Sequence, residues 1–452
     1  MVSNKLASMP WRWILIGILC AFVVLSVQYN RETPYRTAGI VQRTQVLDVG
    51  APDERQHANY VTRIQNGEGF PVFDAKDPNL YETYQSHQPP AYYLIAGGLA
   101  RVMGADLTSS SGGFGLRLLS TFFGIGTILG VFFAARWGLN RDDIALCAAA
   151  ICAFLPMFLA LHSAISNDPM LFCLCTWSLA LCAYMIRLGW DLPRIMLLGA
   201  IVGLALLTKT TALALLIVVA ISIVASRKLS HPKLVAWSAV VIPLVVAAPW
   251  WIRNMNLYGD PFAMKAFKDA FTGSAQASMF IESFGALDYW VNWVGWWTLR
   301  SFIGAFGYMD IFFADTLYRM IVAVFLVGAL AWALKRSKPE TSATADPASC
   351  SFTIVAWCFF AIILGYFFMF NMTYFQAQAR YLYPAIAPIS IGLSVGLCSL
   401  MQKRSFWTSI IVSALLIALN VYALSRLPDD FRKRGAVAIG KSTFFGASQS
   451  IV

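Results

Sequence analysis

Long apolar stretches, separated by short polar breaks, follow one another along the chain from Trp11 to Leu424. Most of them are long enough to cross a hydrocarbon core of about 30 Å as a helix. The pattern therefore predicts an all-α polytopic membrane protein. We expect eleven spanning helices, at residues 11–29, 114–135, 144–160, 169–188, 194–208, 210–226, 234–252, 316–335, 352–370, 381–401 and 405–424.

Two places in this pattern need a separate interpretation. The stretches 194–208 and 210–226 are divided only by the run Thr208-Lys209-Thr210-Thr211. Because a lysine at mid-bilayer is costly, we expect a tight turn there at one membrane face. The apolar run 91–103 is short for a span and contains two glycines, which suits an interfacial or re-entrant helix.

The composition supports the membrane assignment. Hydrophobic residues make up 58% of the 452 residues and charged residues only 13%, whereas a soluble domain is about a quarter charged. Eight of the nine cysteines lie in apolar runs, and there is no CxxC pair. A cytosolic enzyme, a disordered chain and a secreted disulfide scaffold are thereby excluded.

The net charge of +11 indicates orientation rather than a nucleic-acid partner. With the N-terminus inside, the inner segments carry 14 Lys and Arg and five Asp and Glu, whereas the outer segments before residue 425 carry 13 and 16. This bias follows the positive-inside rule. We therefore expect a multi-pass protein of the cell (inner) membrane whose longer loops face the periplasm or exterior.

The domain organisation is simple in this interpretation. Residues 1–424 form one transmembrane domain with two long exterior segments, 30–113 and 253–315, the first of them structured with interfacial helices. Residues 425–452 form a short tail with five basic and two acidic residues. Eleven spans place this basic tail outside, so either one span is miscounted or the tail is an exception to the rule.

Candidate chemistry begins in the first exterior segment. Asp53 and Glu54 stand close to His57, and paired carboxylates beside a histidine bind a divalent metal or act as a general base. The simpler alternative is a solvated turn in which Asp53 caps a helix. Further along, His87 precedes two prolines and suits proton transfer or an anion contact.

Charged residues also stand beside the ends of later spans. Asp168 follows Ser166 and Asn167, and Lys209 stands among threonines that suit a phosphate. Their simpler interpretations are a helix start with a proline at its first turn and a snorkelling lysine. Arg253 and Arg380 are equally compatible with interfacial anchors.

These residues become more informative as a group. Under the predicted orientation Asp53, Glu54, His87, Asp168, Lys209, Arg253 and Arg380 all lie on the exterior side, each beside a helix end. Acids together with Lys and Arg at one face suit a substrate that carries a phosphate and must be deprotonated or bound through a metal.

The same stretches resemble the GT-C superfamily of polyprenyl-phosphate-dependent glycosyltransferases, in particular bacterial relatives of the protein mannosyltransferase and aminoarabinose transferase families and DUF2142-type membrane proteins. The resemblance runs from the first helix to about residue 390. The matching motifs are Asp53-Glu54 with His57, His87-Gln88-Pro89-Pro90 before Tyr92-Tyr93, Ser166-Asn167-Asp168, Arg253-Asn254 with Tyr258-Gly259-Asp260-Pro261, and Gln378-Ala379-Arg380-Tyr381 with Pro384. The sequence departs from many DUF2142-type relatives at Ala379, where they have glycine.

The resemblance implies a GT-C-like bundle that transfers a sugar from a polyprenyl-phosphate donor to a lipid, glycan or protein acceptor. It implies that Asp53 deprotonates or orients the acceptor hydroxyl, with Glu54 beside it. The implied substrate- and phosphate-binding residues are His87, Asp168, Lys209, Arg253, Tyr258, Arg380 and Tyr381. A divalent metal is left open, with Asp53, Glu54, His57 and Asp168 as its candidate ligands.

Two other functions use similar groups. A transporter or flippase for a lipid-linked sugar requires charged or broken-helix sites near mid-bilayer, whereas here the charges gather at one face. A non-catalytic protein that binds lipid carriers differs only in lacking activity. The sugar, the acceptor and the oligomeric state are not encoded in any recognisable motif.

Overall fold

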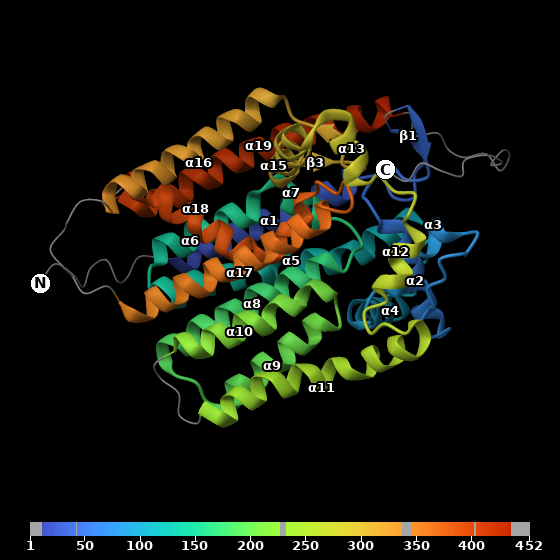
Figure 1. Cartoon of the computed structure of the whole chain (residues 1–452). Coiled ribbons are helices and arrows are strands. Elements are labelled where there is room, and N and C mark those ends of the chain that lie inside the picture. Colours follow the sequence, from blue (N-terminus) through green and yellow to red (C-terminus); the bar gives the residue numbers. More distant parts are fainter. Residues whose placement is uncertain (1–10, 42, 227–231, 337–345, 402–403, 435–452) are drawn as a thin grey trace, which may run out of the picture.

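The computed structural model describes residues 11–41, 43–226, 232–336, 346–401 and 404–434 and confirms the all-α membrane fold. Long helices lie side by side as a bundle (Figure 1). Within these residues, eight helical stretches are long and apolar enough to cross a membrane. They are α1 (Trp11–Glu32), α5 (Ser110–Leu139), α8 (Asp168–Leu188), α11 (Pro232–Tyr258), α16 (Asp315–Arg336), α17 (Pro347–Asn371), η5 with α18 (Ala379–Ala385 and Ile386–Met401), and α19 (Ser405–Lys433).

The three other predicted spans are also helical but shorter or broken. Residues 144–160 form α6 (Asp142–Phe154) and α7 (Pro156–Leu161), which are separated where Leu155 precedes a proline and takes an extended conformation. Residues 194–226 form α9 (Leu192–Leu206), the short turn η3 (Thr210–Ala212) and α10 (Leu213–Ala225). The turn predicted around Lys209 is therefore present.

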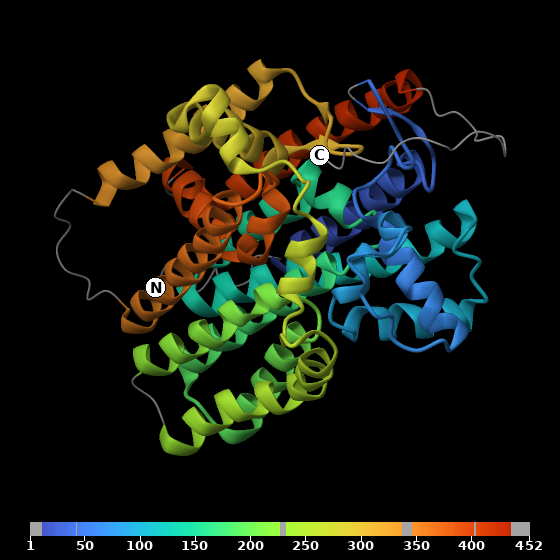
Figure 2. The same cartoon turned by 45° about the vertical axis from the view of Figure 1, so that its right-hand side comes forward.

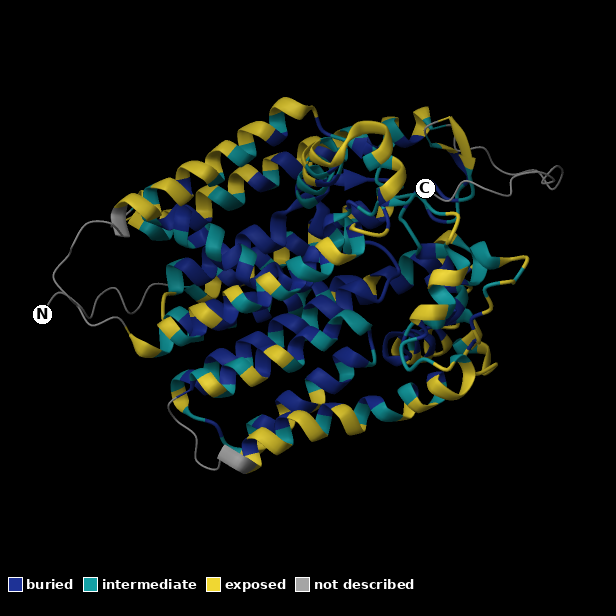
Figure 3. Cartoon of the chain, in the orientation of Figure 1, coloured by how far each residue is buried: buried dark blue, intermediate teal, exposed yellow. Residues whose placement is uncertain are grey.

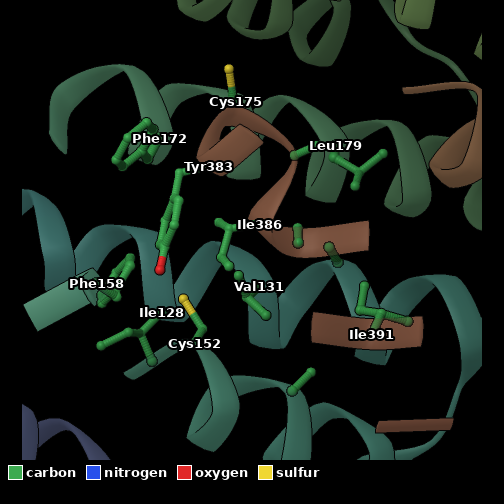
Figure 4. Close-up of a cluster of buried hydrophobic side chains, with 14 of the residues drawn as sticks. Ile128, Val131, Cys152, Phe158, Phe172, Cys175, Leu179, Tyr383, Ile386 and Ile391 are labelled. Atoms are coloured by element: carbon green, nitrogen blue, oxygen red, sulfur yellow. The ribbon is translucent and has the colours of Figure 1, made fainter. Parts of the chain in front are cut away.

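The core of the bundle lies around α6, which is almost entirely buried, and around the largely buried α5 and α8, whereas α16 lies on the outside (Figure 3). Glycines let α5 and α8 approach closely, because a Cβ added at Gly130 would lie only 2.4 Å from the Thr176 hydroxyl oxygen. Ile128 and Val131 of α5 pack near Phe172 of α8 and Tyr383 of η5 (Figure 4). This packing fixes the start of α8 relative to η5.

Both long segments between spans fold over the same end of the bundle, which we call the loop end (Figures 1 and 2). The first contains the hairpin β1 (Gly39–Val41) and β2 (Thr44–Val46), α2 (Glu54–Asn66), α3 (Leu80–Thr83), η2 (Tyr84–His87) and α4 (Ala91–Met103). The second contains α12 (Met264–Ala270), α13 (Ala277–Phe284), α14 (Ala286–Asp288), the π-helix η4 (Tyr289–Gly295), α15 (Trp296–Ile303), β3 (Ala305–Phe306) and β4 (Ile311–Phe312).

The short helix α4 holds the first segment against the bundle. The rings of Tyr93 on α4 and Tyr60 on α2 stack with their centres 3.7 Å apart, and both are buried. The backbone N–H of Ala91 donates to the carbonyl of Leu207 at the α9–η3 turn, at 2.9 Å. One side of α4 remains exposed and apolar, including Leu94 and Val102.

The last spanning helix extends into the segment that we predicted as a short tail. α19 continues to Lys433, past Leu424, so the first part of residues 425–452 is helical. Its basic residues pair with acids, and Arg434 forms an ion pair of 2.6 Å with Asp310 of the second segment. Residues 435–452, with Lys441, lie outside the described residues.

Candidate functional site

The loop that precedes α2 places Asp53 in an unusual backbone conformation. Its φ of 62° lies in the left-handed region, which is unfavourable for a residue with a side chain. Although Asp53 occupies the position before the helix, its side chain makes no capping hydrogen bond. The carboxylate turns instead to Arg380, with Oδ2 2.7 Å from Nη1, and Oδ1 accepts a hydrogen bond from the Tyr84 hydroxyl.

Arg380 comes from η5, far from Asp53 in the sequence. Its backbone is held because the neighbouring Ala379 N–H donates to the Ser301 hydroxyl at 2.9 Å. The guanidinium carbon lies 5.3 Å from the centre of the Tyr381 ring. The buried Nε–H of Arg380 has no partner among the described residues, so this side chain can donate one more hydrogen bond.

A second ion pair lies beside the first. Asp168 is the first residue of α8, and its Oδ1 accepts from Lys209 Nζ at 2.6 Å. Asn167 donates to the carbonyl of Thr208 at 3.1 Å and so fixes the α9–η3 turn against the start of α8. Lys209 Nζ also lies 5.9 Å from the centre of the Tyr381 ring. Both cations therefore lie near the ring of Tyr381.

His57, in the first turn of α2, lies close to these four charges. Burial lowers its pKa to about 4, and Asp53, Asp168, Lys209 and Arg380 all act on it electrostatically. Its Nδ1 is 2.7 Å from the Tyr93 hydroxyl. The imidazole is neutral at pH 7 and forms one wall of the charged cluster.

The carboxyl group of Asp53 has a strongly perturbed pKa. Burial raises this pKa, but the Arg380 charge and the Tyr84 hydrogen bond together outweigh burial and lower it to about 2. Asp53 is therefore ionised and weakly basic while Arg380 is its partner. Any group that takes Arg380 away raises the pKa of Asp53 and makes it a better proton acceptor.

His87 lies near the same cluster, but its ring nitrogens are engaged. Its Nδ1 is 2.8 Å from the carbonyl of Tyr84, so this nitrogen donates, and Nε2 then accepts from the Gln88 amide at 3.1 Å. Burial lowers the pKa of His87 to about 4. In this arrangement the histidine has no free N–H for the anion contact that the sequence suggested.

The carboxylate of Glu54 is not part of the cluster formed by the pairs Asp53–Arg380 and Asp168–Lys209. Its two oxygens bind the buried Arg117 guanidinium of α5 at 2.7 and 2.6 Å, and Oε1 also accepts from the backbone N–H of Ile165 at 2.8 Å. Arg117 further donates to backbone carbonyls near the end of α1, including those of Asn30 and Thr33. The expected catalytic partner of Asp53 is thus part of a structural network.

Arg253 and Tyr258, both near the end of α11, hold the first segment in place. Arg253 donates to the carbonyl of Pro71 at 2.7 Å and stacks on Trp250, with 4.5 Å from its guanidinium carbon to the ring centre. The Tyr258 hydroxyl accepts from the backbone N–H of Phe73 at 2.9 Å. Both residues therefore hold the stretch around residues 71–73 against the end of α11.

Asp53, His57 and Asp168, three of the candidate metal ligands, lie near one another, whereas Glu54 is held apart by Arg117. Within the described part of the chain, no group of three or more His, Cys, Asp or Glu side chains is arranged to hold a metal ion. Asp53 and Asp168 each face a cation, Glu54 faces Arg117, and His57 is bonded to a tyrosine. This set does not fit a divalent ion, and we derive no step through one.

Three residues of the site were not singled out from the sequence. Tyr84 binds Asp53, Asn167 fixes the Lys209 turn, and Arg117 holds Glu54. Arg117 did carry a signal, because an arginine inside an apolar span requires a buried partner. Asn167 belongs to the Ser166-Asn167-Asp168 motif and Tyr84 to none, and the partners of both lie far away in the sequence.

Comparisons with known proteins agree with this architecture. Residues 87–252, which include Asp168 and Lys209, match the family described as dolichyl-phosphate-mannose-protein mannosyltransferase. No curated protein matches the sequence. The crystal structure of the Archaeoglobus fulgidus oligosaccharyltransferase, tethered with an acceptor peptide containing the NVT sequon, is similar with a TM-score of 0.52 and 14% identity. The match covers 95% of this chain and 56% of that one.

A second solved structure, that of ArnT from Cupriavidus metallidurans in the apo state, has a TM-score of 0.52 and 15% identity over 89% of this chain and 64% of that one. The chain thus spans between about half and two thirds of these structures. At this identity the likeness shows the fold. Since the matched family and these structures are of the GT-C type, the resemblance to the GT-C superfamily is confirmed.

We predict that Arg117→Met destabilises the protein strongly. The change leaves the buried Glu54 carboxylate without its cation, which typically costs about 3–5 kcal/mol. Thermal unfolding of the purified protein in detergent measures the effect. Arg63→Met is the matched control, because Arg63 forms an exposed pair with Glu68, and such pairs contribute little. Equal melting temperatures for both variants would contradict the assigned role of Arg117.

We also predict that stability falls on mild acidification and that His57 accounts for part of the loss. Burial lowers the pKa of His57 in the folded protein to about 4. Between about pH 6.5 and pH 4 the imidazole therefore binds a proton more readily in the unfolded chain than in the folded protein. The free energy of unfolding falls as the pH falls through this range, by on the order of 2 kcal/mol at about pH 5.

The measurement is thermal unfolding of wild type and His57→Gln at about pH 7.5 and about pH 5. We expect a smaller difference between the two pH values for His57→Gln, whatever its stability at neutral pH. Glu68→Gln, at an exposed position of the same segment, is expected to behave as wild type. An unchanged pH dependence in His57→Gln would show that His57 is not buried in its neutral form.

Proposed function

We propose that this chain is a membrane glycosyltransferase that transfers a sugar from a polyprenyl-phosphate donor to an acceptor at the loop end of the bundle. The observation that carries the proposal is the meeting of the pairs Asp53–Arg380 and Asp168–Lys209 around Tyr381. Two cations suit a phosphate, and a carboxylate beside them suits the proton of an acceptor hydroxyl. The GT-C fold supports this assignment.

The two cations are proposed to bind the phosphate of the donor. Arg380 has a spare Nε–H and Lys209 has further donors, so both accommodate phosphate oxygens. A phosphate competes with Asp53 for Arg380 and with Asp168 for Lys209. Once Arg380 binds the phosphate, the main interaction that lowers the pKa of Asp53 weakens, and the carboxylate becomes more basic.

In the transfer step, the acceptor oxygen forms a bond to the anomeric carbon while the bond from that carbon to the phosphate oxygen breaks. The electron pair remains on the phosphate, where Lys209 and Arg380 stabilise the growing negative charge. Asp53 receives the acceptor proton, and the Tyr84 hydroxyl keeps its carboxylate oriented.

We further propose that the loop end faces the exterior of the cell, the periplasm in a bacterium with two membranes. The support is the distribution of charge, since the opposite end carries the basic excess. A flippase is less well supported, because the paired charges lie at one end of the bundle rather than midway along it. The acceptor is a lipid, glycan or protein that carries a hydroxyl group.

We predict that Asp53→Asn abolishes transfer without loss of fold. Cells that lack the gene are expected to accumulate the lipid-linked sugar, and a plasmid with the wild-type gene should remove it. Since a general base contributes about 10²–10⁴-fold, Asp53→Asn should fail to restore turnover while the folded protein still accumulates, although its melting temperature falls because Arg380 loses its partner.

Asp269→Asn is the matched control for Asp53→Asn, because Asp269 is an exposed acid of the second segment, also at the loop end.

Lys209→Met should instead weaken binding of undecaprenyl phosphate to the purified protein. Full turnover in the Asp53→Asn variant would refute the proposed role of Asp53 as proton acceptor.

The orientation is tested by cysteine labelling of intact cells. In a background without Cys350, a membrane-impermeant maleimide is expected to label Lys76→Cys, which is exposed at the loop end. Arg141→Cys, at the exposed start of α6, should react only after the membrane is permeabilised. The reverse pattern would place the site in the cytoplasm.

A further inference from the structure

Two arginines lie against one tryptophan at the loop end. The tryptophan is Trp296 in α15, and the arginines are Arg300 in the same helix and Arg319 near the start of α16. Each guanidinium carbon lies 5.9 Å from the centre of the Trp296 ring, a distance typical of cation–π contacts. We call these three residues the Trp296 cluster. None of them has a part in the proton and phosphate chemistry proposed above.

Arg300 is mostly buried, but its guanidinium group has few polar partners. Only 15% of its side chain is exposed, and its guanidinium carbon lies 4.8 Å from the ring centre of Trp297 and 4.2 Å from that of Phe312. Its buried Nε–H has no partner among the described residues. Its ion pair with the half-exposed Asp315 has an N–O distance of 3.6 Å, too long for a hydrogen bond. Because buried donors normally have acceptors, this group needs one from outside the protein.

Arg319 is exposed on α16 and forms no hydrogen bond or ion pair with the residues that the structure describes. Other arginines at the loop end are engaged, since Arg253 donates to a backbone carbonyl at 2.7 Å and Arg434 to a carboxylate at 2.6 Å. The Trp296 cluster thus differs in combining two guanidinium groups that donate no hydrogen bond within the described part of the chain. An anion from outside the protein can use both of them.

The Trp296 cluster lies where the protein meets the lipid head groups. α16 is on the outside of the bundle (Figure 3), and its residues Met320 and Val324 are 61% and 52% exposed. Arg319 directly precedes this lipid-facing row, near the start of the spanning helix. Tryptophan and arginine side chains are favoured at this level of a membrane protein. The phosphates of lipid head groups are therefore within reach of the cluster.

We infer that Arg300 and Arg319 bind the phosphate of an anionic phospholipid head group in the leaflet next to the loop end. The inference goes beyond the proposed function, because this lipid stays bound and is not a substrate. Guanidinium groups match phosphate oxygens in both geometry and charge, and the phosphate supplies the acceptors that Arg300 lacks within the protein. A zwitterionic lipid is less suitable, since its own cationic group offsets the charge of its phosphate.

The test locates the bound lipid by photochemical labelling. The full-length protein is placed in nanodiscs of phosphatidylcholine that contain a small share of phosphatidylglycerol with a photoreactive group on its head group. Labelled peptides are identified by mass spectrometry, which separates lipid at the Trp296 cluster from lipid held by the basic residues at the opposite end. Parallel samples carry the photoreactive group on phosphatidylcholine.

The variants are Arg300→Met and Arg319→Met. Because Arg319 is exposed, Arg319→Met is expected to fold as wild type, and it keeps the test decisive if Arg300→Met destabilises the protein. Arg432→Met is the matched control. Arg432 lies at the end of α19, its side chain is 77% exposed, and its ion pair is with Asp429 on the same helix.

For wild type we expect phosphatidylglycerol to label residues 296–303 and 315–325 more strongly than phosphatidylcholine does. Each variant should lower this labelling by phosphatidylglycerol about 5-fold, the contribution of one arginine to the binding of an anionic lipid. Arg432→Met should leave it unchanged, and labelling at the opposite end should be the same in every protein. Unlabelled phosphatidylglycerol should compete for the site, whereas inorganic phosphate should not.

Three results would overturn the inference. If neither variant lowers the labelling, the Trp296 cluster is only an aromatic anchor for α15. If the variants lower labelling by both lipids equally, the cluster does not select an anionic lipid. If inorganic phosphate competes, the cluster binds a free anion rather than a head group. None of these results depends on sugar transfer, so the proposed function is tested separately.

Discussion

The buried ion pair between Glu54 and Arg117 is the interaction on which the loop end depends. Arg117 links α5 to the carboxylate at the start of α2 and to backbone carbonyls near the end of α1, and Glu54 also binds the loop before α8. Four parts of the chain thus meet at one ion pair. Because Glu54 directly follows Asp53, this pair also fixes the backbone that presents Asp53 to Arg380.

The charges of the candidate site neutralise one another in the absence of a ligand. Each carboxylate has one cation and each cation one carboxylate, so the buried cluster carries no net charge. This arrangement avoids the cost of an unpaired buried charge. It also makes binding an exchange of partners, in which an incoming phosphate releases a carboxylate as it takes up a cation. The basicity of Asp53 is thereby coupled to the presence of the donor.

The sequence predicted the helices well because a bilayer demands long apolar runs, and even the turn at Lys209 followed from the cost of burying a lysine. It also placed Asp53, Asp168, Lys209 and Arg380 at one end, because orientation follows from the charges of the loops. It did not separate Glu54 from Asp53, since two adjacent acids look alike until their partners are known. The family resemblance assigned Arg253 and Tyr258 to the substrate, which stays a prediction; in the structure Arg253 donates to the carbonyl of Pro71 and Tyr258 accepts from the N–H of Phe73. Such pairings depend on contacts between distant segments, which no local pattern encodes.

The lengths of α9 and α10 have a consequence for where the reaction takes place. At 1.5 Å per residue, the 15 residues of α9 rise only about 22 Å and the 13 residues of α10 about 20 Å, less than the roughly 30 Å thickness of a hydrocarbon core. If α9 begins and α10 ends at the opposite membrane face, the turn between them lies several ångströms below the surface at the loop end, under α4. Lys209 then forms the floor of a depression in the membrane. A carrier phosphate has to sink below the level of the surrounding headgroups to meet it, and the acceptor has to be admitted from above.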